Sequence, residues 1–308
     1  MTEANFYKRI KSAVKEKLDE DWKVEILTNV KKNNNTLHAA IILGKENDMI
    51  RPQIYLKDFF REYKNGKPIS EIADNIIDCY QRSMEDTEEE IEAVSSFQNW
   101  DSVKDRISLR LISKEMNREK LKDCIHEDFC DLAAMAVVNL QIGKQGTMST
   151  SITHDLSERW DVSEKEILQA AKENTPRLFP AKFKSMEEVL AKMLDVTPED
   201  LDDVIEKIPM YLLTNAYGIF GATVILYESV MKEIYEKIGG KYVILPSSIH
   251  ETIVVPLKEK TDWEELQNMV ENVNQSHVLE EEVLSNNVYF YDGSKVVLAC
   301  DGNGVCFA

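Results

Sequence analysis

The stretch MYLLTNAYGIFGATVILYESVMKEIYEKIGGKYVILPSSIHETIVVPL, residues 210–257, carries the clearest structural pattern in this sequence. Aliphatic and β-branched runs bounded by Gly and Pro predict strands at 210–215, 222–227, 242–245 and 252–255. The apolar stripe that runs from Val230 to Ile238 and stops at Gly239 predicts a helix with a left-handed glycine cap. The expected order is strand, strand, helix, strand, strand. It indicates an α+β fold more clearly than it indicates a function.

The rest of the chain alternates between amphipathic helices and short strands. Helical spacing predicts helices over 3–18, from 69 to 80, near 115–124 and over 261–275. Period-two or β-branched patterns predict strands at 22–27, 37–43, 54–56, 106–112, 137–142, 147–153, 287–291 and 295–298. The strand over 106–112 should bury one face and expose the other. The segment 154–205 is expected to be helical throughout, and a capping box at Ser163 and Glu166 marks a helix start within it. The prediction is an α+β protein with mixed or antiparallel sheets, flanking helices and a helical segment in the middle of the chain.

The length of 308 residues favours two domains. Thr197-Pro198 has the form of a helix start, and Ile208-Pro209 follows as a break. We therefore expect a boundary near 205–209. The first domain would span 1–205 and end in a helical subdomain at about 154–205. The second would be a β-rich α+β module over 206–308.

Composition limits the classes of partner. The chain has 55 Asp and Glu against 37 Lys and Arg, a formal net charge of −18. This charge repels nucleic acid and anionic lipid, so neither nucleic acid nor a membrane is expected as a partner. The longest apolar run, 132–138, is too short to cross a bilayer. Five cysteines and the lack of an apolar N-terminal leader favour an acidic protein of the cytoplasm.

One loop combines the side chains of nucleophilic catalysis. Ser247, Ser248, His250 and Glu251 lie within Pro-Ser-Ser-Ile-His-Glu, between two predicted strands. A serine activated by an oriented imidazole and an acid needs these residue types. Catalytic triads usually draw their members from separate elements, however, and Pro-Ser-Ser is also ordinary turn chemistry. The loop is a weak catalytic candidate, with ligand or partner contact and a structural hairpin as the alternatives.

No cofactor or metal site is expected. Cys124 and Cys130, and likewise Cys300 and Cys306, are separated by five residues, which is longer than the usual zinc knuckle. Residues 301–304, Asp-Gly-Asn-Gly, lack the later glutamate of a calcium loop. No phosphate-binding glycine loop, zinc-protease motif or nucleophile elbow occurs. The isolated histidines at 38, 154 and 277 are expected to be structural.

Four phrases together resemble a known kind of protein: NTPRLFP at 174–180, MYLLTN at 210–215, ILPSSIHE at 244–251 and EVLSNNVYFYD at 282–292. They resemble an uncharacterised domain-of-unknown-function family of anaerobic Gram-positive bacteria, over the whole length of the chain. The resemblance implies a bacterial cytosolic protein and carries no catalytic residue with it.

The leading hypothesis is a non-enzymatic binding or regulatory protein with an unknown protein or small-molecule partner, because acid–base, metal and phosphate motifs are missing. The alternative is a hydrolase-like enzyme that uses the Ser247/Ser248, His250 and Glu251 loop.

Overall fold

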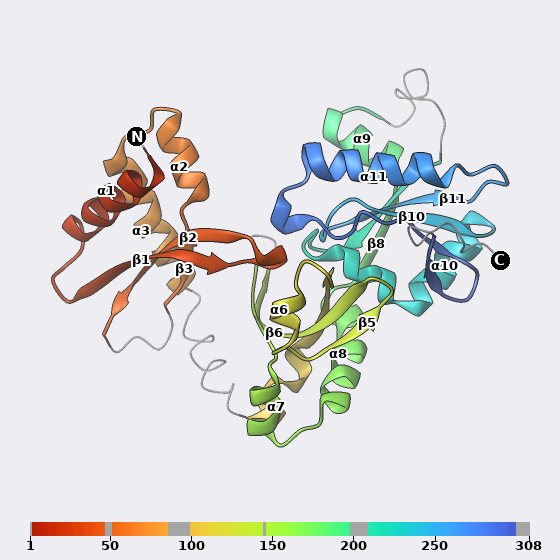
Figure 1. Ribbon diagram of the computed structural model, residues 1–308, viewed down its shortest axis with the longest axis horizontal. Coiled ribbons are helices and arrows are strands. Elements are labelled where there is room, and N and C mark those ends of the chain that lie inside the picture. The colour runs from red at the N-terminus through yellow and green to blue at the C-terminus, as the bar shows by residue number, and fades with distance from the viewer. Residues whose placement is uncertain (1, 47–50, 86–98, 144–145, 198–208, 300–308) are drawn as a thin grey trace. The chain divides into compact units, whose positions relative to one another are not determined.

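The computed structural model describes residues 2–46, 51–85, 99–143, 146–197 and 209–299 (Figure 1). The chain forms two compact units, Met1–Phe97 and Gln98–Ala308, and each is described by itself. Within the described residues all three sheets are antiparallel and helices flank them, so the α+β prediction is confirmed.

Unit 1 is a three-stranded sheet covered by helices. Its order is β1-β2-β3, built from β1 (Trp22–Lys31), β2 (Leu37–Lys45) and β3 (Gln53–Tyr55), which confirms the predicted hairpin. The helices are α1 (Glu3–Glu16), α2 (Lys57–Lys64) and α3 (Ile69–Glu85). Phe6, Ile10 and Val14 recur on one face of α1 and are buried against the sheet and α3. Burial of this apolar face is the main force that holds the unit together.

Unit 2 begins with short helical turns, α5 (Trp100–Val103) and η2 (Lys104–Arg106), and a four-stranded sheet. The strands are β4 (Ile107–Ser113), β5 (His126–Phe129), β6 (Leu132–Gly143) and β7 (Gly146–Ser151), with β6 paired to the other three. The helices of this part are α6 (Arg118–Leu121), α7 (His154–Trp160) and α8 (Glu164–Leu178). The prediction that β4 exposes a polar face is wrong, because all residues of β4 except Arg110 are buried. Packing on both faces explains this: an apolar cluster that includes Ile112 and Leu121 of α6 lies on one, and α8 lies against β4.

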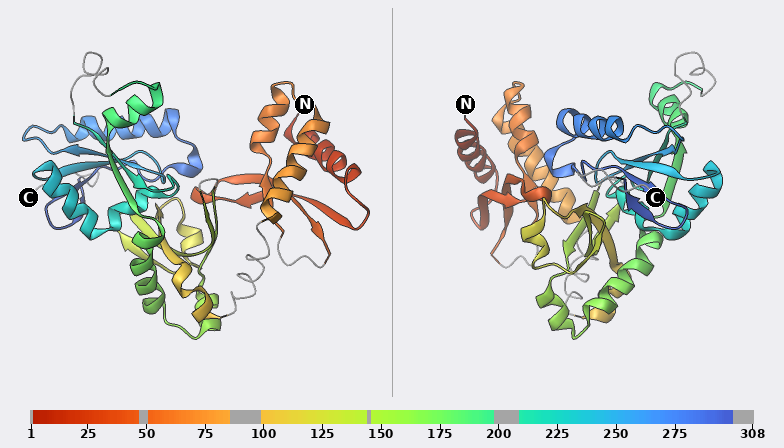
Figure 2. Two further views of the ribbon diagram at one scale, coloured as in Figure 1. Left: turned by 180° about the vertical axis from the view of Figure 1, so that it is seen from behind. Right: turned by 45° about the vertical axis from the view of Figure 1, so that its right-hand side comes forward.

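The second sheet of unit 2 has six strands in the order β13-β12-β10-β11-β9-β8. Their bounds are β8 (Ala181–Ser185), β9 (Tyr211–Asn215), β10 (Tyr242–Pro246), β11 (Thr252–Pro256), β12 (Tyr289–Tyr291) and β13 (Val296–Leu298). The helical elements are α9 (Met186–Leu194), η4 (Gly221–Leu226), α10 (Glu228–Ile238), α11 (Trp263–His277) and η5 (Glu280–Glu282). Figures 1 and 2 show α9 and α11 on one face of this sheet and α10 on the other. Alternation along β10 explains both contacts, since Val243 packs under α11 while the Tyr242 hydroxyl donates to the Met231 carbonyl of α10 at 2.9 Å.

The local signals for helix ends are confirmed. The Ser163–Glu166 capping box forms in full, and Gly239 closes α10 with φ 83°. Two expectations are wrong. Residues 222–227 form the 3-10 helix η4 instead of a strand, and the middle segment is interrupted by β8. The predicted helix start at 197–198, the acidic run after Glu85 and the pair Cys300/Cys306 lie wholly or partly outside the described residues.

The structure groups the chain differently from the predicted division near 205–209. β8, from before that point, pairs with β9, from after it, with Ala181 opposite Asn215 and Ser185 opposite Tyr211. The division between compact units falls at Phe97 and Gln98 instead. Both sides of the predicted boundary therefore contribute strands to one sheet.

None of the described helices combines the length and the apolar character that a membrane crossing requires.

Candidate functional site

The predicted loop is the turn of the β10–β11 hairpin, and the Ser248 hydroxyl takes part in the hydrogen bonds of that turn. The Ser248 backbone N–H donates to the Glu251 carbonyl at 3.2 Å, and the His250 N–H donates to the Ser248 Oγ at 3.0 Å. Ile249 is buried, and its N–H donates to the Glu282 carbonyl at 2.8 Å. The Ser248 hydroxyl therefore organises the local backbone, as serine does in many turns.

The His250 ring is held between backbone and carboxylate. Its Nδ1 accepts the Phe220 backbone N–H at 3.2 Å, which leaves the hydrogen of a neutral ring on Nε2. That Nε2 lies 3.5 Å from Glu282 Oε1. The structure thus brings the His250 ring together with Glu282, and among the described residues no hydrogen bond joins that ring to Ser247, Ser248 or Glu251. A base that activates serine needs a free ring nitrogen at the hydroxyl, and this arrangement does not supply one.

Arg110, from β4 of the four-stranded sheet, contacts the same group of residues. The Arg110 guanidinium lies 3.5 Å from the centroid of the Phe220 ring, whose other neighbour is the His250 ring at 5.6 Å. Arg110 also donates to the Ser149 Oγ at 2.6 Å, and desolvation lowers the pKa of its guanidinium to about 10. Cation–π contact is favourable for a desolvated arginine. We call Arg110, Phe220, His250 and Glu282 the stacked cluster.

Sequence reasoning found only His250 of the stacked cluster. The backbone of Phe220 lies in the left-handed region, with φ 53°, and Gly221 follows in close contact with the loop. These two residues directly precede 222–227, the run whose composition predicts a strand, and no sequence pattern indicates the left-handed backbone at Phe220. Glu282 did have a signal, because it opens the phrase over 282–292 that carried the resemblance.

A second group of hydrogen-bonded side chains, centred on Asp131, connects the two sheets of unit 2. Asp131, in the turn between β5 and β6, accepts hydrogen bonds from Ser285 Oγ at 2.8 Å, Asn287 Nδ2 at 3.0 Å and Tyr289 Oη at 2.5 Å. The three donors alternate along one segment, so they share a face. Burial and the Asp131 carboxylate raise the pKa of Tyr289 well above its ordinary value. The phrase over 282–292 therefore has a structural role as an anchor for Asp131.

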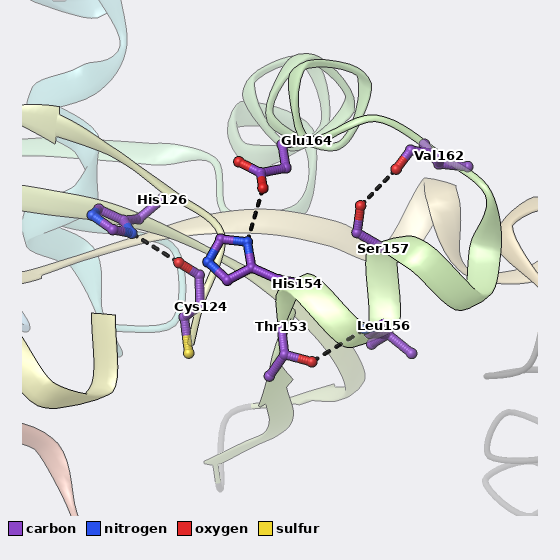
Figure 3. Close-up of polar contacts among 8 residues, drawn as sticks. All are labelled: Cys124, His126, Thr153, His154, Leu156, Ser157, Val162 and Glu164. Atoms are coloured by element: carbon purple, nitrogen blue, oxygen red, sulfur yellow. Dashed lines mark hydrogen bonds and ion pairs between the residues drawn. The ribbon is translucent and has the colours of Figure 1, made fainter. Parts of the chain in front are cut away.

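Cysteine and histidine side chains gather at one end of the four-stranded sheet, as Figure 3 shows. His154 Nδ1 lies 2.8 Å from Glu164 Oε1, and His126 Nδ1 lies 2.8 Å from the Cys124 carbonyl. The Cys124 sulfur points away from both rings. Cys130 lies beyond β5, with its sulfur 4.0 Å from the Val296 carbonyl. Among the described residues, no group of three or more His, Cys, Asp or Glu side chains has the arrangement of a metal site.

Unit 2 contains a cavity of about 560 Å³ that we call the junction pocket. It lies between the two sheets, and its walls come from β4, β5, α8, η4, α10 and the β12–β13 hairpin. The apolar walls include Leu109, Phe129, Pro176, Ile225, Leu226, Tyr227, Met231, Tyr291 and Val296. The charged and hydroxyl groups are Glu127, Lys172, Thr175, Glu228, Ser229, Ser294 and Lys295. Such widely separated residues give no local motif, so sequence reasoning missed this site.

Hydrogen bonds tie the walls of the junction pocket together. The Tyr227 hydroxyl donates to the Phe179 carbonyl at 3.1 Å, and burial raises its pKa above the usual range. The Leu109 N–H donates to Thr175 Oγ1 at 2.8 Å, which fixes β4 against α8. At the entrance, Lys172 forms an ion pair with Glu127 at 2.6 Å. These contacts hold the walls of the pocket in fixed positions, as the walls of most small-molecule sites are.

Comparison with known proteins identifies a family for this chain but assigns it no activity. No curated protein matches the chain, and no solved structure does so. The model of a family of unknown function, DUF5688, matches residues 3–293. The resemblance to an uncharacterised family is thereby confirmed, while the expected origin in anaerobic Gram-positive bacteria stays a prediction. The match covers nearly the whole chain, and the chain belongs to the family of unknown function DUF5688.

Proposed function

We propose that this protein is a non-enzymatic binding protein whose unit 2 takes up a small organic molecule in the junction pocket. The observation that carries the proposal is the cavity itself. Its volume of about 560 Å³ is that of a small-molecule site, and its walls are mostly apolar. A cytoplasmic setting, suggested by the cysteine content, and a bacterial origin, implied by the family resemblance, are part of the same proposal.

The lining residues define the chemistry of the ligand. Phe129, Met231 and Val296 offer apolar surface for a hydrophobic body. Lys295 forms no ion pair among the described residues, and Lys172 has its partner, Glu127, beside it at the wall. A ligand with an apolar body and an anionic group fits this combination, because the anion would meet a lysine ammonium at the entrance. Fixed walls reduce the entropy lost on binding.

The hydrolase-like alternative has less support. His250 accepts a backbone hydrogen bond at Nδ1, and Ser248 Oγ accepts one from the loop. Catalysis would require both side chains to leave these partners and meet each other. The experiment that separates the alternatives is an ester and phosphoester turnover screen of wild type and His250→Gln. Turnover lost in the variant would favour the enzyme.

The binding proposal is tested with 1-anilinonaphthalene-8-sulfonate, which has an apolar body and an anionic group. We expect saturable fluorescence enhancement with wild type. Ser229→Trp, which fills the entrance, and Lys172→Met, which removes a cation, should each weaken binding at least about tenfold, equivalent to about 1.4 kcal/mol. Glu233→Trp and Lys165→Met lie on the same two helices outside the pocket and serve as matched controls.

Equal binding by all four variants would place the dye elsewhere and contradict the proposal. Small aromatic and aliphatic carboxylates can then be screened for displacement of the dye. A compound that displaces it from wild type and raises the melting temperature would identify the ligand class.

A further inference from the structure

An open groove at the end of the six-stranded sheet concentrates positive charge in an otherwise acidic protein. It has a volume of about 450 Å³ and lies beside β8 and α9. Lys182, Lys184 and Lys192 line it together with Val189, Met193 and Leu212. Among the described residues that line it there is no Asp or Glu, although the chain has a net charge of −18. We call it the lysine groove.

The register of the sheet explains why the lysines share this surface. Lys182 is opposite Thr214, and Lys184 is opposite Leu212. Leu212 is in turn opposite Ile253, which packs into the apolar cluster under α11. The two lysines of β8 therefore project from the face that carries α9 and α11, where the Lys192 turn of α9 lies (Figure 1).

The described residues supply few partners for these lysines. Lys182 donates to the Ala216 carbonyl at 2.9 Å, and among the described residues neither Lys184 nor Lys192 has an ion-pair partner. Beside them, the Met193 side chain is 77% exposed and Leu194 is 62% exposed. The groove thus offers three cations and an apolar contact to the same binding partner.

β8 also offers an unpaired backbone. The Ala216 N–H donates to the Pro180 carbonyl and the Met186 N–H donates to the Met210 carbonyl, both at 2.8 Å. Backbone groups alternate in direction along an antiparallel strand, so those of Ala181 and Phe183 point away from β9. Within the described part of the chain, no strand pairs with this edge.

We propose that the lysine groove docks an extended acidic segment of a partner protein, which adds to β8 as a further strand. The main-chain groups of Ala181 and Phe183 would bond the added strand, and alternate carboxylates of that strand would meet the row of lysines. Both spacings are two residues, so one segment satisfies them together. Met193 and Leu194 would contact its apolar side chains.

Edge lysines have a competing explanation, because they also prevent sheets from pairing edge to edge. The two explanations differ in what they predict for an acidic strand. A purely protective row binds no peptide. A docking edge binds a peptide whose charge is complementary and whose backbone can donate hydrogen bonds.

The test uses the full-length protein and a fluorescein-labelled synthetic peptide that alternates Glu and Val, followed by anisotropy at low salt. We expect saturable binding to wild type and a loss of at least about tenfold in the double variant Lys182→Gln/Lys184→Gln. The control Lys165→Gln/Lys232→Gln removes two exposed lysines from α8 and α10 and should bind as wild type does. Circular dichroism checks that both variants keep the native fold.

Two further peptides test the mode of binding. A peptide with Gln in place of Glu should bind at least about tenfold more weakly, and so should a Glu peptide N-methylated along one edge. Equal binding of the N-methylated peptide, or full competition by inorganic polyphosphate with no effect of N-methylation, would overturn strand addition in favour of a general anion site. If wild type does not bind the Glu–Val peptide, the proposal is overturned. It is overturned equally if the peptide binds only to a variant in which Glu199, Asp200, Asp202 and Asp203 are neutralised.

Discussion

At the scale of single residues, unit 2 depends on hydroxyls that satisfy buried backbone groups. β4 is an edge strand, and the N–H of Leu111 points away from its partner β6. That N–H donates to Thr223 Oγ1 at 3.0 Å, as Leu109 does to Thr175. Thr252 offers a contrast, since its hydroxyl is buried and has no hydrogen-bond partner in the described structure. The same residue type is therefore expected to have opposite effects at the two positions.

We predict that Thr223→Val lowers the free energy of unfolding by about 1–3 kcal/mol, because the shape is kept and the Leu111 N–H loses its acceptor. Thr252→Val should leave stability unchanged or raise it, because a buried hydroxyl without a partner is replaced by a methyl group. Urea unfolding of both variants followed by circular dichroism measures the difference. Equal destabilisation by both substitutions would contradict this account of the hydroxyls.

The buried tyrosines predict a loss of stability at high pH. Burial raises the pKa of Tyr227, Tyr242 and Tyr289 above the ordinary value of 10.0. A raised pKa in the folded state means that the unfolded chain releases these protons first. Their stabilising contribution is full below about pH 10 and is lost as the pH rises towards the folded pKa values.

We therefore expect tyrosinate absorbance from these three residues to appear together with the loss of far-UV circular dichroism above about pH 10. Tyr242→Phe removes one ionising group and should reduce the size of that coupled step. A gradual titration of every tyrosine with the secondary structure intact would show that these side chains are accessible in the folded protein.

At the scale of elements, local signals were predictable and close tertiary contacts were not. The Ser163 capping box and the Gly239 cap depend on residues within one turn, so the sequence is sufficient to find them. The run over 222–227 has strand-like residues, but in η4 every residue except Leu226 is buried, and the helix follows a left-handed Phe220. A short apolar run cannot distinguish these outcomes.

The candidate site shows the same limit. The loop around His250 was identified because its residues are neighbours in sequence. Its actual partners, Glu282 and the Phe220 backbone, come from other elements. The junction pocket could not be predicted from the sequence for the same reason. Its walls come from elements between β4 and β13, and no spacing rule links their residues.

The first residue of η4, Gly221, gives a prediction for an element. A Cβ on Gly221 would lie 2.1 Å from Thr214 Oγ1 and 2.5 Å from the His250 carbonyl oxygen. Gly221→Ala should therefore push the β10–β11 hairpin from β9 and cost about 3 kcal/mol or more. Gly240→Ala is the matched control, because a Cβ there meets nothing within 4 Å. Thermal unfolding of the two variants measures the cost, and a stable Gly221→Ala protein would show that the turn can relax.

At the scale of the whole molecule, each unit has an apolar core of its own. The cluster around Phe6, Ile41 and Ile76 lies entirely in unit 1, whereas the clusters around Met135 and Val243 lie in unit 2. A core of its own is what allows a domain to fold alone. The position of a cut should therefore decide whether fragments of the chain fold.

We predict that a fragment of residues 98–308 folds cooperatively, because it keeps both sheets and their helices. Fragments 1–205 and 206–308, cut at the boundary suggested by the sequence, should leave the second fragment without β8 and expose the edge of β9. Unpaired backbone and uncovered apolar surface favour partly folded, aggregating states. Near-UV circular dichroism and calorimetry distinguish a cooperative fold from a molten one. A cooperative transition for 206–308 alone, or its absence for 98–308, would restore the boundary near 205.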